Sequence, residues 1–559
     1  MVEKIKRIPM GLDDFGKLIR ENYYYTDKTL FIKQLIDNRS EVNLFTRPRR
    51  FGKSLNISML QYYFDNTLAH QSHLFDGLLI SKEADYYKSY QNQFPVIKMT
   101  LKGAEGLIFD SAFARFQTII ISEFDRHRYL LESEKLSETQ KTNFSSIINR
   151  TSNFDAYASS LRFLSDCLYQ HYDKQVVILI DEYDVPIEKA HANNYYEEMV
   201  SFIRSFFGEA LKTNPSLYFS VVTGCLRISK EAIFTGLNNL DVISITSNAY
   251  SEYFGFTDEE ASAMLTYYGL EAKLPEMRNW YNGYLFGETT VYNPWSAIAY
   301  LSDARSGKKY PRPHWSNTSS NYIVRQLIDI ADFITKQEIE HLIAGGTITK
   351  PIKEDIVYAE ITSTMDNLWN FLFFTGYLKK ISELQKGVHI HYELAIPNKE
   401  VKYIFERHIT EWLDEKIKIT DLQTFYQSII DGDVDTFEEQ MTLFLMEVIS
   451  FMDSHENFYH GFLGGILRSM NGYIVKSNRE TGDGRSDYFI KPTSIRKTAF
   501  IIEVKIADSI ANLEAACYEA LKQIDTKDYA GELALDGYTN VVKYGLAFFK
   551  KVCMVKKGH

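Results

Sequence analysis

The chain has 559 residues, a formal net charge of -11 at neutral pH, and hydrophobic and aromatic shares of 45% and 14%. This length exceeds a single hydrophobic core, so we expect several domains, and the apolar share excludes an intrinsically disordered protein. The negative charge excludes a protein that binds nucleic acid over its whole surface, because phosphate affinity comes mainly from lysine and arginine. Any contact with DNA or RNA must therefore be local.

We expect neither a signal peptide nor a membrane-spanning segment. The opening residues carry charges and no apolar region, and no later stretch approaches about 18 uninterrupted apolar residues. The cysteines are widely separated and form no CxxC pair, which argues against disulfides and structural zinc. The sequence therefore predicts a cytoplasmic protein with no membrane partner.

Between about residues 40 and 245, short apolar runs alternate with longer segments of helical periodicity. This is the pattern of a parallel sheet covered by helices. The predicted strands are Val42 to Phe45, Val96 to Leu101, Val176 to Ile180, Leu217 to Val222 and Val242 to Thr246. The predicted crossover helices are Ser54 to Phe64, Ile108 to Phe124, Tyr157 to Tyr172 and Tyr195 to Leu211. This half of the chain is therefore predicted to be α/β.

A phosphate-binding loop is predicted between the first strand and the first of these helices. Such a loop needs this setting, because the helix N-terminus and its backbone N–H groups hold a phosphate. We expect Lys53 to reach the β- and γ-phosphates of ATP and the Ser54 hydroxyl to coordinate Mg2+. The loop departs from the pattern GxxxxGK(S/T) at its first position, where Arg47 replaces glycine. The predicted nucleotide-binding residues of the loop are Arg47, Arg49, Arg50, Gly52, Lys53 and Ser54.

A second motif ends the apolar run Val176 to Ile180, which is followed by Asp181 and Glu182. A buried strand that ends in two acids is a Walker B motif, in which Asp181 would hold Mg2+ and Glu182 would act as general base toward the attacking water. The strand predicted at Val96 to Leu101 lies between the two motifs and agrees with an ASCE-type ATPase. Further along, Thr223 is a candidate to contact the γ-phosphate, and Arg227 is a candidate to offset its negative charge. A strand-ending turn with a surface arginine explains these two residues equally well.

The pattern becomes mostly helical from about residue 250 to 400, with an interrupting loop around Tyr310 to Asn321. We predict a helical or winged-helix lid there. Roughly the last hundred residues return to an α/β mixture. The predicted domains are a P-loop ATPase domain at 1–245, the lid at 246–400, a helical connector at 401–455 and a C-terminal α/β domain at 456–559.

A Glu-x-Lys pattern occurs on the strand predicted at Ala499 to Ile506. Alternation of side chains places Glu503 and Lys505 on one face, and Asp487 begins a second strand close enough in sequence to pair with the first. Two carboxylates can hold Mg2+ or Mn2+, with the Val504 carbonyl as a third ligand, while a lysine orients or deprotonates the attacking water. A Glu-x-Lys pattern alone is more simply a surface salt bridge. The added Asp487 and the shared strand face, together with the family resemblance given below, favour a nuclease fold instead.

Several further segments occur together with these motifs. They are Ile8 to Gly11 with Asp13 to Phe15, Tyr24 to Thr29, Thr46 to Ser54, Asp181 to Asp184, Thr223 to Ser229, Asn293 to Trp295 and Phe374 to Leu378. Together they resemble the bacterial AAA-ATPase-like family, and the resemblance covers nearly the whole chain. The loop Arg-Pro-Arg-Arg-Phe-Gly-Lys-Ser is its most specific part. An arginine-rich loop is usual in that family, which makes Arg47 less anomalous.

The resemblance implies a P-loop NTPase of the ASCE or AAA-like type with a lid, and a PD-(D/E)XK nuclease-like domain of the restriction-endonuclease-like α/β fold at the C-terminus. In similar nuclease domains a glutamine on the following helix assists the site, and Gln523 matches that position. A solvent-exposed glutamine at a helix end is the alternative. The predicted function is ATP hydrolysis that regulates Mg2+-dependent cleavage of DNA or RNA. The alternative function is a nucleotide-dependent switch or scaffold whose nuclease-like domain binds without cleaving.

Overall fold

The computed structural model describes residues 5–38, 40–226, 233–234, 238–315, 322–354, 364–387, 389–419, 422–448, 456–478 and 487–558. The chain divides into two compact units. Unit 1 comprises Met1–Asn321 and Thr347–Ile404, and unit 2 comprises Tyr322–Gly346 and Phe405–His559. The segment Tyr322–Gly346, which the sequence assigns to the lid, therefore groups with the C-terminal half of the chain.

A five-stranded parallel sheet forms the core of unit 1, in the order β2-β3-β4-β1-β5. Its strands are β1 (Val42–Thr46), β2 (Val96–Thr100), β3 (Val176–Asp181), β4 (Leu217–Gly224) and β5 (Leu240–Ile243). Every residue of β1 and β3 is buried, as expected for parallel strands that are covered on both faces. The predicted strands are confirmed to within a few residues at each end.

The order of the strands identifies the type of ATPase fold. β4 pairs in parallel with both β1 and β3. One strand therefore separates the strand before the phosphate-binding loop from the strand of the Walker B motif, which is the ASCE arrangement. β2 lies between the two motifs in the sequence but at the edge of the sheet. The ASCE-type prediction is confirmed, with β4 rather than β2 as the separating strand.

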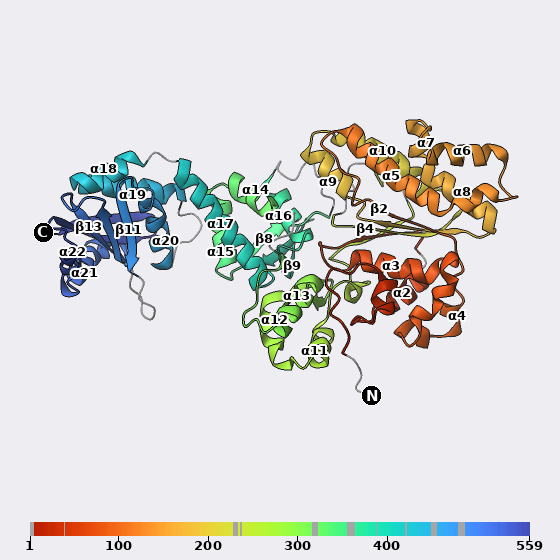
Figure 1. The fold of residues 1–559 in the computed structure, drawn as a ribbon, viewed down its shortest axis with the longest axis horizontal. Coiled ribbons are helices and arrows are strands. Elements are labelled where there is room, and N and C mark those ends of the chain that lie inside the picture. Colours follow the sequence, from red (N-terminus) through yellow and green to blue (C-terminus); the bar gives the residue numbers. More distant parts are fainter. Residues whose placement is uncertain are drawn as a thin grey trace. The chain divides into compact units, whose positions relative to one another are not determined.

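Some of the helices of this part of unit 1 cover the two faces of the sheet, and the others pack outside them. In chain order, the helices are α1 (Phe15–Arg20), α2 (Leu30–Asn38), α3 (Lys53–Phe64), α4 (Asp85–Lys88), α5 (Phe109–Arg126), α6 (Glu138–Ile148), α7 (Phe154–Ala158), α8 (Ser160–Tyr172), α9 (Val185–Ala192) and α10 (Tyr196–Leu211). In Figure 1, α5, α8 and α10 lie above the sheet and α2 and α3 lie below it. The helix predicted at Tyr157 to Tyr172 is divided at Ser159 into α7 and α8.

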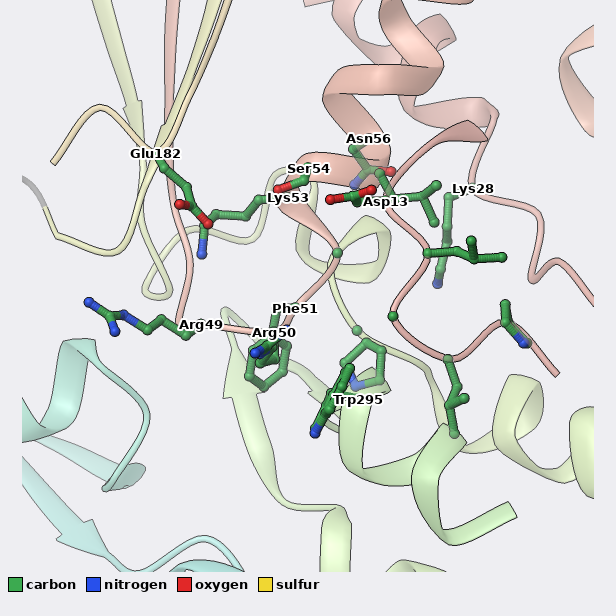
Figure 2. Close-up of a pocket in the computed structure, with 18 of the residues that line it drawn as sticks. Asp13, Lys28, Arg49, Arg50, Phe51, Lys53, Ser54, Asn56, Glu182 and Trp295 are labelled. Atoms are coloured by element: carbon green, nitrogen blue, oxygen red, sulfur yellow. The ribbon is translucent and has the colours of Figure 1, made fainter. Parts of the chain in front are cut away.

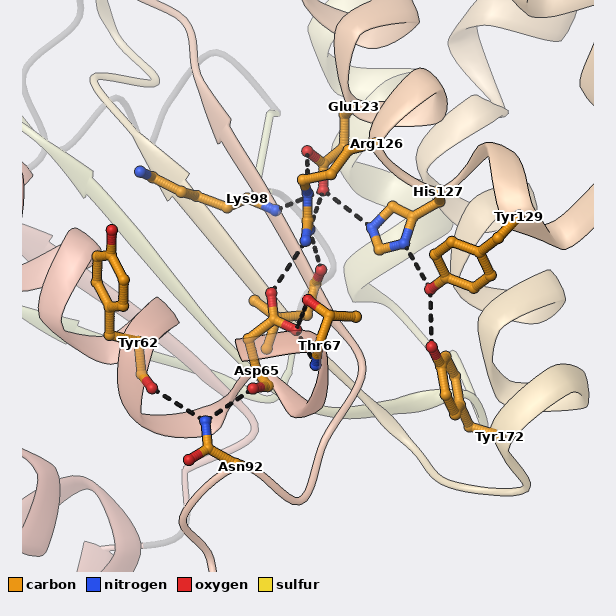
Figure 3. Close-up of polar contacts among 11 residues, drawn as sticks. Tyr62, Asp65, Thr67, Asn92, Lys98, Glu123, Arg126, His127, Tyr129 and Tyr172 are labelled. Atoms are coloured by element: carbon orange, nitrogen blue, oxygen red, sulfur yellow. Dashed lines mark hydrogen bonds and ion pairs between the residues drawn. The ribbon is translucent and has the colours of Figure 1, made fainter. Parts of the chain in front are cut away.

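A buried polar network fastens α5 to the sheet and to the end of α3 (Figure 3). Arg126 donates hydrogen bonds to Glu123 and to the backbone carbonyl of Val96 in β2, and its Nη1 lies 2.9 Å from Asp65 Oδ2. The His127 ring lies 3.3 Å from the Glu123 carboxylate. Burial of these charges is tolerated because each is paired or hydrogen-bonded. The network lies at the amino end of β2, away from the strand ends that carry the two motifs.

The rest of unit 1 combines helices with short antiparallel strands. The helices are α11 (Asp258–Tyr267), α12 (Leu274–Tyr281), α13 (Pro294–Arg305) and α16 (Met365–Phe374), and β6 (Tyr284–Phe286) pairs with β7 (Thr289–Val291). A three-stranded sheet has the order β8-β10-β9, with β8 (Ile348–Pro351), β9 (Lys379–Lys386) and β10 (His389–Ala395). Helix α17 (Lys399–Ile419) begins in unit 1 and ends in unit 2.

A five-stranded mixed sheet, β11-β12-β13-β14-β15, forms the core of unit 2. Its strands are β11 (Tyr473–Asn478), β12 (Asp487–Pro492), β13 (Ala499–Ile506), β14 (Val541–Phe549) and β15 (Val552–Gly558). The helices are α14 (Tyr322–Ile330), α15 (Phe333–Ile343), α18 (Gln423–Asp431), α19 (Val434–Val448), α20 (Glu456–Leu467), α21 (Leu513–Thr526) and α22 (Tyr529–Leu535). Ile501 of β13 packs with Ile524 of α21 and Leu533 of α22. The α/β prediction for this end of the chain is confirmed.

Candidate functional site

A cavity of about 490 Å3 lies at the carboxyl ends of the unit 1 strands (Figure 2). Its walls come from the loop between β1 and α3, the segment after β3, the residues before and after α1, and the helices α11 and α13. Sites for small molecules span roughly 300 to 1,000 Å3. The cavity has the size of a small-molecule site. Arg49, Lys53 and Glu182 lie at one end, which we call the charged end, and Trp295 lies toward the other, which we call the apolar end (Figure 2).

The loop between β1 and α3 has the conformation that its sequence requires. Gly52 is the N-cap of α3 and has a φ angle of 82°, a left-handed conformation that favours glycine. Lys53 begins α3, and its Nζ donates hydrogen bonds to the carbonyl oxygens of Arg47 at 2.8 Å and Pro48 at 2.9 Å. The lysine that the motif directs at phosphates is thus held by carbonyls of its own loop.

Asp181, at the end of β3, accepts hydrogen bonds from two hydroxyl groups. Ser54 Oγ donates to Asp181 Oδ2 at 2.5 Å, and Thr223 Oγ1 donates to Asp181 Oδ1 at 2.5 Å. A hydroxyl next to a carboxylate offers the hard oxygen ligands that Mg2+ prefers, so Ser54 and Asp181 fit this ion. Thr223 is 1% exposed and does not line the cavity. Its hydroxyl therefore orients Asp181, and the contact with a γ-phosphate that the sequence suggests stays a prediction.

Glu182 and Asp184 line the cavity on the segment after β3. Glu182 has a φ angle of 55°, a strained conformation for a residue other than glycine, and its carboxylate lies near Lys53 (Figure 2). Burial and the neighbouring Asp181 raise its pKa, which suits a general base. Asp184 is 2% exposed. Its Oδ2 accepts a hydrogen bond from the Cys225 N–H at 2.7 Å, and no described residue donates to its Oδ1.

Gly224 allows the Walker B segment to approach the end of β4. A Cβ atom at this position would lie 2.5 Å from the Tyr183 ring and 2.9 Å from Asp184 Oδ1. The backbone N–H of Tyr183 also donates to the Thr223 carbonyl at 3.0 Å. The Thr-Gly pair at the end of β4 is therefore explained by its contacts with the acidic segment.

Arg47 supports the loop through buried contacts outside the cavity. Its side chain is fully buried, and Nη1 donates to the carbonyl oxygens of Thr46 and Ile243, each at 2.9 Å. The guanidinium lies 5.2 Å and 5.1 Å from the ring centroids of Phe254 and Phe286. Arg47 does not line the cavity. The structure thus gives Arg47 a packing role, and the nucleotide contact expected from the sequence stays a prediction.

The other two loop arginines line the cavity. Arg49 Nη2 lies 2.5 Å from Glu188 Oε2 on α9, and the Arg50 guanidinium lies 4.4 Å from the ring centroid of Trp295 (Figure 2). Glu188 carries no motif signal in the sequence, whereas Trp295 belongs to one of the segments that carry the family resemblance. Arg227 lies outside the described residues.

The apolar end of the cavity is built from segments that are distant in the sequence. It is lined by Pro9, Leu12, Leu18, Tyr24, Phe256, Met264, Trp295 and Ile298. Lys28 joins two of these segments, because its Nζ lies 2.6 Å from both carboxylate oxygens of Glu260 on α11. A charged end beside an apolar end suits a nucleotide, whose phosphates need charge and whose base needs apolar contact.

The residues of the predicted nuclease site come from β12, β13 and α21 in unit 2. The antiparallel register pairs the backbone of Asp487 directly with Glu503. Lys505 Nζ lies 3.6 Å from Glu503 Oε1 and donates a hydrogen bond to Gln523 Oε1 at 2.6 Å. Gln523 is partly buried and bound to Lys505, unlike a solvent-exposed glutamine at a helix end. The fold thus brings Glu503, Lys505 and Gln523 together, with the backbone of Asp487 opposite Glu503.

The Glu503 carboxylate is suited to a cation. Glu503 is 1% exposed, and no described residue donates a hydrogen bond to its Oε2. A buried carboxylate oxygen without a partner is costly, and Mg2+ or Mn2+ would satisfy it. Among the side chains that the structure describes, no three His, Cys, Asp or Glu residues gather into a metal site. Two of the predicted ligands are not among these side chains. The side chain of Asp487 lies outside the described side chains, and the Val504 ligand is a backbone carbonyl.

Comparisons with known proteins agree with both regions. Residues 9–234 match the model of a family described as predicted AAA-ATPase, and residues 454–558 match that of the PD-(D/E)XK nuclease superfamily. Over 554 residues the chain is 26% identical to a protein of Azotobacter chroococcum mcd 1 described as "Uncharacterized protein in vnfD 5'region", an alignment that covers 95% of this chain and 94% of that protein. In the described part of the chain, no helix has the length and apolar character needed to cross a membrane. The chain therefore carries an AAA-ATPase-like domain, followed by a domain of the PD-(D/E)XK nuclease superfamily.

Proposed function

We propose that the chain is an ATP-hydrolysing protein in which the state of the nucleotide regulates a Mg2+-dependent nuclease. The observation that carries the proposal is the hydrogen bond between Ser54 and Asp181, which joins the two nucleotide motifs across 127 positions of sequence beside Lys53. The contact between Lys505, Glu503 and Gln523 supports the nuclease part.

At the charged end of the cavity, Lys53 would exchange the carbonyls of its own loop for the β- and γ-phosphates of ATP. Ser54 and Asp181 would hold Mg2+, which when bound offsets the charge of the phosphates. Glu182 would accept the proton of the attacking water, since its raised pKa makes it a better base than an ordinary carboxylate. Trp295 and the apolar residues around it would contact the base.

In unit 2, Asp487, Glu503 and the carbonyl of Val504 would hold Mg2+ or Mn2+, which when bound polarises the scissile phosphate of DNA or RNA. Lys505 would orient or deprotonate the attacking water. Gln523 would keep the Lys505 ammonium in place through the hydrogen bond between them.

Substitutions in the cavity test the ATPase part. Lys53→Ala is expected to abolish ATP hydrolysis and weaken nucleotide binding, because it removes the charge directed at the phosphates. Glu182→Gln should bind ATP without turning it over. Phosphate release and binding of a fluorescent ATP analogue measure both effects. Lys33→Ala is a matched control, because Lys33 pairs with Glu83 outside the cavity. Equal turnover in all variants would refute the site assignment.

Incubation of the purified protein with plasmid, linear and single-stranded DNA and with RNA, with and without ATP and Mg2+, tests the nuclease part. Asp487→Asn, Glu503→Gln and Lys505→Ala should each eliminate cleavage and leave ATP hydrolysis near the wild-type rate, because the two sites belong to different units. Cleavage that persists in all three variants would point to another site.

The net charge of -11 favours a second candidate, a nucleotide-dependent switch or scaffold. In that case the nuclease-like domain would bind nucleic acid without cleaving it. Binding of the same substrates by the wild-type protein, with no cleavage at any concentration of Mg2+, Mn2+ or ATP, would support this candidate over the first.

A further inference from the structure

The pair formed by Arg49 and Glu188 connects the phosphate-binding loop to helix α9. Arg49 Nη2 lies 2.5 Å from Glu188 Oε2, and the two side chains are 25% and 11% exposed. Both residues line the cavity. Helix α9 begins directly after Asp184, so the pair also joins the loop to the Walker B segment. A charge-assisted contact that is mostly shielded from water is stronger than an exposed ion pair.

Arg49 shares the charged end of the cavity with Lys53. Burial raises the pKa of Asp184, whereas Lys53 and Arg49 both act to lower it, so the two cations lie near the same carboxylate. Lys53 is the residue that the motif directs at the β- and γ-phosphates. A γ-phosphate bound by Lys53 would therefore lie within the field of Arg49.

We propose that Arg49 and Glu188 form a sensor of the γ-phosphate: ATP, but not ADP, transfers Arg49 from Glu188 to the γ-phosphate and thereby frees α9. The inference rests on the proposed function, since it takes nucleotide binding in this cavity as given. A γ-phosphate competes for the guanidinium because it carries more negative charge and more acceptor oxygens than one carboxylate. Glu188 is then left beside the phosphates without its partner, and charge repulsion pushes α9 away from them.

A matched control is present in the same cavity. Glu105 also lines the cavity and pairs with Lys189 of α9 at 3.8 Å, with side chains that are 42% and 37% exposed. The distance in this pair is longer and its side chains are more exposed than in the pair of Arg49 and Glu188. Neither residue belongs to the phosphate-binding loop between β1 and α3. Removing the Glu105 charge tests the general effect of one less negative charge in the cavity.

The experiment measures the affinities of ATP and ADP by titration calorimetry in the presence of Mg2+, in the Glu182→Gln background so that ATP persists. Glu188→Gln is expected to tighten ATP binding about tenfold, or about 1.4 kcal/mol, and to change ADP binding by less than about twofold. Arg49→Ala should weaken ATP binding more than ADP binding. In the Arg49→Ala background, Glu188→Gln should tighten ATP binding by much less than about tenfold, because no Arg49 remains to be released. Glu105→Gln should leave the ratio of the two affinities unchanged.

Glu188→Ala provides a second test of the same expectation if Glu188→Gln does not fold. Equal tightening of ATP and ADP by Glu188→Gln would overturn the sensor, because Glu188 would then act only as a negative charge near the phosphates. The same effect of Glu188→Gln with and without Arg49 would also overturn it. Failure of the Glu182→Gln protein to bind either nucleotide would be a distinct result, which overturns the proposed ATPase function together with the sensor.

Discussion

Asp181 is held by one hydroxyl group from α3 and one from β4. If Mg2+ takes the Ser54 hydroxyl and one oxygen of Asp181, the bond from Thr223 remains to orient the carboxylate. Thr223 is 1% exposed, so loss of its hydroxyl would leave Asp181 Oδ1 without this partner in a buried position. Such a loss costs about 1 to 3 kcal/mol.

Thr223→Val removes this hydroxyl and keeps the shape of the side chain. We expect kcat for ATP hydrolysis to fall about tenfold, which corresponds to about 1.4 kcal/mol, with a smaller change in KM. Steady-state phosphate release measures both constants. Thr223→Ser is the control, because it keeps the hydroxyl and should retain most of the activity. A raised KM with an unchanged kcat would instead indicate that Thr223 contacts the nucleotide directly.

The residues of the candidate nucleotide site differ in how far the sequence reveals them. Lys53 and Ser54 follow from one short motif, because their positions depend on a local turn between a strand and a helix. The partner of Arg49 is 139 positions away and has no local pattern. Arg47 is enclosed by Phe254 and Phe286, which fold over the loop from distant segments. A local motif therefore indicates the kind of site, and distant contacts decide which arginines face it.

Helix α17 begins at a buried carboxylate. Glu400, in the first turn, is fully buried, and its Oε1 accepts hydrogen bonds from Ser296 Oγ at 3.0 Å and from the Trp315 N–H at 2.8 Å. Ser296 belongs to α13 and follows Trp295, which lines the cavity. Burial raises the pKa of Glu400 to about 7. The start of the helix that leads into unit 2 is thus attached next to the cavity of unit 1 by a carboxyl group whose pKa is raised to about 7.

Glu400→Gln should make the stability of unit 1 less dependent on pH. The folded pKa of about 7 exceeds the ordinary value of 4.5, so the native chain binds an extra proton between these values. The contribution of Glu400 is fully present below about pH 4.5 and is lost as the pH rises to about 7, by an amount of up to about 3 kcal/mol. Thermal unfolding from pH 4.5 to 8 should therefore show the variant gaining in Tm relative to wild type as the pH rises.

The comparison of the two proteins isolates this group. Tyr281 and Tyr284 face Glu400, and the backbone of His314 donates to it. These groups are present in both proteins, so their own titration cancels in the difference. A difference in Tm that is constant across this range of pH would contradict the buried ionisation of Glu400.

Periodicity predicts the elements of unit 1 more completely than it predicts their arrangement. Long helices such as α10 and buried strands such as β3 follow from the spacing of apolar residues. The periodicity of the mostly helical region does not indicate the hairpin of β9 and β10, although a winged-helix lid would include a hairpin. Its strands carry half-exposed apolar residues, Ile381, Leu384 and Ile390, and so lack a clean alternation of buried and exposed positions. The order of strands in the sheet depends on contacts between distant segments, and no local sequence pattern predicts it.

At the scale of the whole molecule, one chain carries two candidate sites of different predicted chemistry in two compact units. The sequence motifs predict both candidate sites, because each site is built from the end of a strand and the element next to it. The sequence does not predict where the chain divides into units. Tyr322–Gly346 groups with the C-terminal residues through contacts between segments that are distant in the sequence. Helix α17 is one of the segments through which the chain passes from unit 1 to unit 2.

We expect the nucleotide state to control the nuclease, because a continuous helix leads from the neighbourhood of the cavity into unit 2. Coupling requires that ATP bind two conformations with different affinity, and a tenfold shift in the active population needs about 1.4 kcal/mol of differential binding. One charge-assisted contact of a γ-phosphate, with Lys53 or Arg49, is worth roughly 1.5 to 3 kcal/mol and is sufficient. Cleavage by the Glu182→Gln variant should therefore differ by about tenfold between no nucleotide, ADP and ATP at saturating Mg2+. The Lys53→Ala variant should cleave at the same rate in all three conditions, since its nucleotide binding is weakened. Indistinguishable rates in the Glu182→Gln variant would mean that the two activities share a chain without affecting each other.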